Sequence, residues 1–94
     1  MKYTNKLELL GTQIGSNIRN ARRRRKIKMA SLAEQCGISR PTLSSIEAGN
    51  LGVSLGSFLA VLSALGLEKD ILRVAYNDTA GRQMQDKDLN ERIK

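Results

Sequence analysis

The sequence is poor in the residue types that build reactive or cross-linked sites. Its 94 residues include no histidine, no tryptophan, one proline and one cysteine, Cys36. A single cysteine excludes an internal disulfide and a cysteine-rich metal site, and Cys36 is expected to be a small buried hydrophobic residue. Because histidine is absent and the nine acidic residues show no paired or metal-like spacing, we expect neither an enzyme nor a cofactor.

Aromatic residues and long apolar runs are also scarce. The aromatic residues are Tyr3, Phe58 and Tyr76, and none is interleaved with the basic run at residues 22–28. Proteins that bind single-stranded nucleic acid usually stack bases on exposed aromatics, so that function, or ribosome binding, is a weaker alternative. Since the sequence shows no apolar run of membrane-spanning length and no signal-peptide pattern, we expect a cytoplasmic protein without membrane contact.

Positive charge is concentrated in the first third of the chain. The net charge is +7, and residues 1–30 carry nine Lys or Arg against the single acid Glu8. The rest of the chain is close to neutral, so the distribution suits an oriented contact with a polyanion. The densest run, residues 22–28, cannot all face one partner, because successive helical residues point about 100° apart. We expect about two or three of its side chains to touch phosphate.

The spacing of apolar residues predicts an all-α protein, a compact five-helix bundle. The predicted helices cover about residues 6–25, 29–36, 40–48, 55–65 and 68–76, although a capping box of Ser31 and Glu34 would start the second helix later, at Ser31. Gly11 and Gly15 are expected to weaken the first helix by about 1 kcal/mol each relative to alanine. Three regions follow: an N-terminal arm with the start of helix one (1–13), a helical domain (14–76) and a polar C-terminal tail (77–94) that is expected to be mobile unless a partner orders it.

Residues 29–49 have the pattern of a helix-turn-helix. Ala33 supplies a small side chain where two helices meet, and Gly37 lies four residues later, where the chain must turn sharply. Ser39 is a suitable N-cap for the second helix. Apolar residues then mark the inner side of the second helix: Ile38, Leu43 and Ile46. Glu47 is expected to close the helix or to pair within the protein rather than contact a base.

Four segments, IRNARRRRKI, LAEQCGIS, RPTLSSIEAGN and SLGSFLAVLSALGL, together resemble the Xre/Cro-repressor helix-turn-helix family. The resemblance covers about residues 14–76. It implies a lambda-repressor-like DNA-binding domain and a sequence-specific double-stranded DNA-binding transcriptional regulator, a repressor. Family members often begin the first motif helix with a cap followed by glutamine, whereas this chain has Lys28 and Met29 there.

The resemblance implies that the start of the second motif helix faces base edges. The residues that match are Arg40, Pro41, Thr42, Ser44 and Ser45. An arginine can donate two parallel hydrogen bonds to guanine, so Arg40 is the main candidate for base recognition. The residues expected to contact phosphate are Arg22, Arg24, Arg25, Lys28, Ser39 and Asn50.

One recognition helix covers few base pairs, so we expect a symmetric homodimer on two half-sites. The expected dimer interface comprises Leu67, Ile71 and Val74. The run GVSLGSFLAVLSALGLEKDI, with Asp78, Gly81 and the ending LNERIK, is similar to HipB-type antitoxins, which implies an autorepressor and a HipA-like kinase toxin as partner. The alternatives are a stand-alone phage-type or bacterial repressor, and a helix-turn-helix protein-interaction module.

Overall fold

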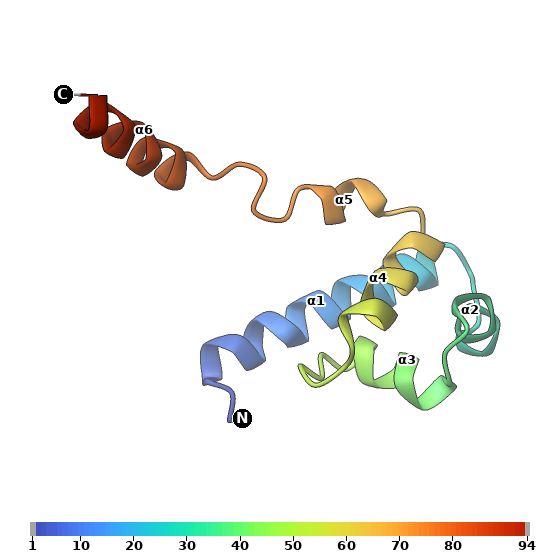
Figure 1. The fold of residues 1–94 in the computed structure, drawn as a ribbon. Coiled ribbons are helices and arrows are strands. Elements are labelled where there is room, and N and C mark those ends of the chain that lie inside the picture. Colours follow the sequence, from blue (N-terminus) through green and yellow to red (C-terminus); the bar gives the residue numbers. More distant parts are fainter. Residues whose placement is uncertain (1, 94) are drawn as a thin grey trace.

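The part of the chain that the structure describes is entirely helical outside its loops (Figure 1). The computed structural model describes residues 2–93, and the side chains of residues 2–88. The helices are α1 (Asn5–Arg24), α2 (Met29–Cys36), α3 (Arg40–Glu47), α4 (Leu55–Ala64), α5 (Glu68–Leu72) and α6 (Thr79–Ile93). The all-α class is confirmed, but the predicted number of five helices is wrong, because residues 79–93 form α6.

The core lies where the C-terminal half of α1 meets α2, α3 and α4. It is built from aliphatic side chains at helical spacing: Ile18, Ala21, Leu32, Ala33, Leu43, Ile46, Val61 and Leu65. All of them are at most 3% exposed. Because α2 and α3 both insert apolar residues into this core, their polar sides are held at the surface in fixed orientations.

Two glycines allow α1 to lie directly against the end of α3. A Cβ atom on Gly15 would be 2.6 Å from the carbonyl oxygen of Glu47, and one on Gly11 would be 2.6 Å from that of Gly49. Since real Cβ atoms do not approach backbone that closely, both positions require glycine. The two glycines are thus expected to weaken α1 itself, and at the same time they allow it to pack closely against the end of α3.

The last two helices differ from the prediction. α5 ends at Leu72 instead of Tyr76, because the amides of Arg73 and Val74 bond to carbonyls three residues back and Ala75 takes a φ of 59°. No helix was predicted in the tail, yet α6 begins at Thr79. The carboxylate of Asp78 accepts a hydrogen bond from the Gly81 amide at 3.0 Å, which satisfies an N-terminal amide of α6.

The chain is more extended than a compact domain of this length. Its radius of gyration is 17.6 Å, compared with about 12 Å for a compact chain of this size. Figure 1 shows the N-terminal half of α1 projecting from the core, and α6 standing apart at the end of a connecting segment. The ending LNERIK lies outside the residues whose side chains are described.

Candidate nucleic-acid interface

The turn between α2 and α3 has the geometry that its sequence predicted. Gly37 takes a left-handed φ of 69°, and the next amide, that of Ile38, donates a hydrogen bond to the Ala33 carbonyl at 3.0 Å. This pattern ends α2 and redirects the chain within two residues. Ala33 is 1% exposed, so a larger side chain there would separate the helices.

Helix α3 has a buried apolar side and an exposed polar side. Ser39 caps it by accepting a hydrogen bond from the Thr42 amide at 3.2 Å, and Pro41 stands in the first turn, where it needs no amide hydrogen bond. Of the residues expected at base edges, three are exposed and two are half-buried. The exposed residues are Arg40, Pro41 and Ser44; the half-buried residues are Thr42 and Ser45.

Two hydroxyl groups on this side are partly occupied by each other. The oxygens of Ser39 and Thr42 lie 2.8 Å apart, in hydrogen-bond contact. Ser39 is exposed, so it retains a solvent-facing side, but its main structural task is to start α3. Arg40 makes no ion pair within the part of the chain that the structure describes, and its guanidinium is exposed.

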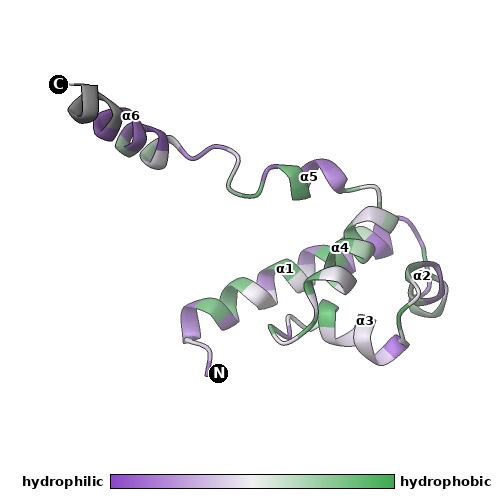
Figure 2. Ribbon diagram, viewed as in Figure 1, coloured by the Kyte–Doolittle hydropathy of each residue, from purple (hydrophilic) through white to green (hydrophobic). Residues whose placement is uncertain are grey.

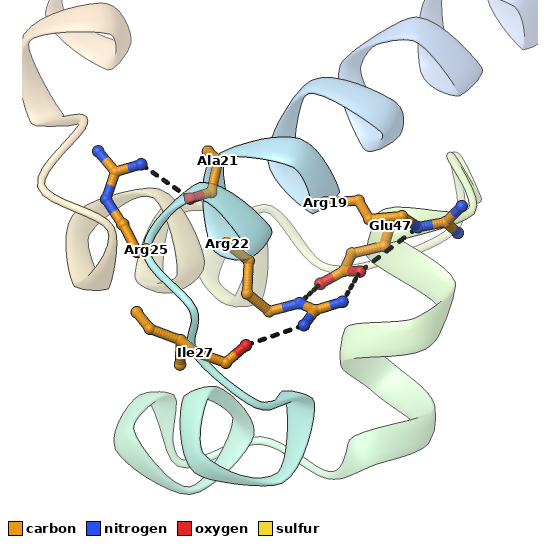
Figure 3. Close-up of polar contacts among 6 residues, drawn as sticks. All are labelled: Arg19, Ala21, Arg22, Arg25, Ile27 and Glu47. Carbon is orange, nitrogen blue, oxygen red and sulfur yellow. Dashed lines mark hydrogen bonds and ion pairs between the residues drawn. The ribbon is translucent and has the colours of Figure 1, made fainter.

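Arg22 is not a surface residue. Its Nε lies 2.7 Å from Oε2 of Glu47 and its Nη2 lies 3.0 Å from Oε1, while Nη1 donates to the Ile27 carbonyl at 2.9 Å (Figure 3). Arg22 is 8% exposed and Glu47 is 3% exposed. The hydrogen bonds to Glu47 raise the pKa of Arg22. The predicted phosphate contact of Arg22 is therefore wrong, and the predicted internal pairing of Glu47 is confirmed.

The other predicted phosphate residues remain on the surface but do not share one side. Arg24, Arg25 and Lys28 are exposed. Arg25 donates a hydrogen bond to the Ala21 carbonyl at 2.8 Å and extends away from Arg22 and α3 (Figure 3). Lys28 precedes α2 and makes no capping hydrogen bond with its side chain. The basic run is thus divided between the core, two sides of α1 and the start of α2.

Arg19 is a further basic residue beside α3, and it was not predicted from the sequence as a contact residue. Its Nε lies 3.6 Å from Oε1 of Glu47, and 42% of its side chain is exposed, which places a half-exposed cation beside α3 (Figure 3). The signal was its spacing: Arg19 lies three residues before Arg22 and so shares a side of α1 with it. It was not predicted because it lies outside the run of four arginines at residues 22–25.

Asn50 follows α3 in an exposed loop. Its side-chain oxygen accepts a hydrogen bond from the Gly52 amide at 2.7 Å, which fixes the loop, while its amide group keeps two donors. The residue before it, Gly49, has a φ of 85° and passes close to Gly11. Asn50 is thus held in place by the α1–α3 contact.

Cys36 lies at the end of α2, away from these polar groups. It is half-buried rather than fully buried, and its thiol lies 3.7 Å from the Ala60 carbonyl oxygen. Burial raises the pKa of the Cys36 thiol, so the reactive thiolate is disfavoured and packing is its main role.

Two short helices joined by a left-handed glycine, with an exposed polar first turn on the second, define the class of helix-turn-helix DNA-binding proteins. A family model described as Helix-turn-helix matches residues 18–72. The chain belongs to this helix-turn-helix family, of the Xre/lambda-repressor type, and is a DNA-binding transcription regulator. Comparisons with curated proteins and with solved structures gave no match.

The remaining surface offers little else that is chemically specific. Among the described residues, no helix is long and apolar enough to cross a membrane. No group of three or more acidic, cysteine or histidine side chains within that same part of the chain is placed to hold a metal ion. The exposed polar side of α3 is therefore the candidate site on which function is argued.

Proposed function

We propose that this chain is a sequence-specific repressor that binds double-stranded DNA as a homodimer. The observation that carries the proposal is the exposed polar side of α3, where Arg40 in the first turn and Ser44 in the second are exposed above the core. Arginine and hydroxyl groups at the start of such a helix suit the hydrogen-bonding edges of the major groove. Occupying an operator would then block transcription.

Phosphate contacts would surround this base-reading surface. We assign them to Arg24, Arg25, Lys28, Ser39 and Asn50, which the sequence indicated, and add Arg19, which lies beside α3. Arg22 is omitted because Glu47 neutralises it in the core. Among these residues Arg25 is the weakest candidate, since it extends away from α3 (Figure 3). Each real contact would add to the salt dependence of binding.

Support for a homodimer comes from an apolar groove on another side of the molecule. A hollow of about 530 Å³ lies between α1, α4 and α5, and all three residues of the expected dimer interface line it: Leu67, Ile71 and Val74. Ile14 and Leu55 also line it and are 45% and 68% exposed. An apolar surface of this kind marks an interaction site, and a second copy would double the DNA contacts.

A narrower proposal concerns the partner. In the antitoxin role that the HipB resemblance implies, the chain would also hold a HipA-like kinase toxin, and the exposed side of α6 is the surface we assign to it. The supporting observation is that α6 stands apart from the core (Figure 1). Removing residues 77–94 should then abolish co-purification with such a kinase and leave duplex binding intact.

The experiment that tests the main proposal is selection of bound sequences from random duplex DNA, followed by Arg40→Ala. We expect a selected palindrome, and a loss of about 10- to 100-fold for the preferred base at one position per half-site, the value of one bidentate contact. The control is Arg82→Ala, which removes the same charge from exposed α6. Equal loss on operator and random duplex would contradict a base-reading role for Arg40, and no selected motif would favour the interaction-module alternative.

A further inference from the structure

A second surface hollow lies at the starts of α2 and α3, beside the residues proposed to contact bases. A hollow of about 380 Å³ is lined by Met29 from the start of α2 and by Arg40, Pro41 and Ser44 from the first turns of α3. Two of the four side chains are apolar, and the other two carry hydrogen-bonding groups. The hollow therefore combines a hydrophobic wall with polar groups suited to a base edge.

The fold fixes the hydrophobic wall. Met29 is half-buried and packs against the core, so only part of its side chain faces outward. Pro41 is exposed, and its ring is held by the first turn of α3, which Ser39 caps. Because Met29 and Pro41 come from different helices, the hollow exists only when the turn at Gly37 brings the two helix starts together.

The chemistry of this wall does not suit phosphate. A thioether is a weak acceptor and has no hydrogen to donate, and proline offers no amide donor. Methionine is instead flexible and polarisable, which favours contact with small apolar groups. In the major groove, the apolar group on a base edge is the C5-methyl of thymine, which distinguishes it from cytosine.

We propose that Met29 and Pro41 form a seat for the C5-methyl group of a pyrimidine in the operator. Met29, a residue of α2, thereby determines specificity beside the guanine assigned to Arg40. This inference rests on the proposed function, since it names the base that the same surface selects. The methyl group could be supplied by thymine or by 5-methylcytosine, because both carry it at the same position.

The first test needs only the wild-type chain and its selected operator. Each thymine is replaced in turn by uracil, which removes the methyl group and nothing else. At one thymine per half-site we expect affinity to fall about fourfold, the value for burying one methyl group. Placing cytosine and then 5-methylcytosine at that position tests the second source: the methylated base should recover most of this methyl-dependent affinity.

Variants then assign the effect to the hollow. Met29→Gln should bring the thymine-to-uracil ratio close to one, whereas Met29→Leu should keep it near the wild-type value. The matched control is Met84→Gln, the same exchange at an exposed position on α6. Thermal melting of each variant checks that the fold survives. If Met29→Gln is unstable, the thymine-to-uracil comparison on the wild-type chain still tests the methyl seat.

The outcomes separate this inference from the function on which it rests. A selected operator with no thymine sensitive to uracil would overturn the methyl seat and leave the repressor intact. An unchanged ratio in a folded Met29→Gln protein would assign the methyl contact to another residue and also overturn it. No sequence preference in any duplex would overturn the repressor, and the methyl seat with it.

Discussion

Two sides of this molecule differ in how far their apolar residues are exposed. Along α2 and α3 the large aliphatic side chains are buried or half-buried, and the outer surface is polar. Along α1, and on α5 and the turn after it, several remain uncovered: Leu7, Leu10, Ile14, Leu72 and Val74 are between 43% and 78% exposed. Figure 2 shows hydrophobic residues recurring along α1 and on α5, whereas the start of α3 is hydrophilic.

The difference shows which side is complete in a single chain. The α2–α3 side has its core beneath it and the start of α3 capped by Ser39, so it can meet the polar surface of DNA as it stands. The α1–α4–α5 side leaves an apolar groove open to water, which favours a second protein surface there. We infer that the α2–α3 side binds DNA and that the α1–α4–α5 side joins two copies of the chain.

The largest expected effect would come from breaking the buried ion pair between Arg22 of α1 and Glu47 of α3. Arg22→Ala should lower the free energy of unfolding by about 3–5 kcal/mol, because it leaves the buried carboxylate of Glu47 without its main partner. Urea denaturation followed by circular dichroism measures this loss. Arg24→Ala, at an exposed position of the same helix, should change stability by less than about 0.5 kcal/mol.

A double variant sharpens this test. Arg22→Met combined with Glu47→Leu replaces both charges by apolar groups, and it should recover most of the stability that Arg22→Ala loses. If Arg22→Ala and Arg24→Ala had the same urea midpoint, the ion pair would not hold α1 against α3.

A smaller effect is expected at the α1–α3 contact. Gly15→Ala should lower stability by about 1–3 kcal/mol, because its Cβ would overlap the backbone of residues 46–49. Gly56→Ala is the matched exchange in α4, where nothing lies within 4 Å of the new Cβ, and it should gain up to about 1 kcal/mol. Thermal melting compares the two, and a stabilising Gly15→Ala would refute the close approach.

The sequence predicted the α2–α3 side well because its signals are local. The cap Ser39, the turn residue Gly37 and the apolar spacing each act within one or two turns, and α2 ends and α3 begins where they indicated. The capping role of Asp78 was equally local, but the sequence of residues 79–93 shows no sustained helical spacing of apolar residues, so periodicity gave no sign of α6.

The burial of Arg22 depends on a partner that is distant in the sequence. Four consecutive arginines look alike in sequence, and only Glu47, 25 residues later, determines which one is buried. A partial signal was present, because Arg22 lies four residues after Ile18 and continues the apolar side of α1. The sequence predicted no contact for Met29, and the only signal at this position was the absence of the glutamine that is common in the family. Its neighbour Pro41 lies twelve residues later and is brought beside it only by the fold.

The most direct test of the two-sided account compares Val74→Asp with Leu72→Asp on a full palindromic operator and on a single half-site. Both residues are exposed to a similar degree on or beside α5, at 78% and 74%, but only Val74 lines the apolar groove. The account predicts that Val74→Asp binds the half-site like Leu72→Asp, yet loses the tighter, two-chain binding to the full site. Equal binding of both variants to the full site, each as a dimer, would contradict it.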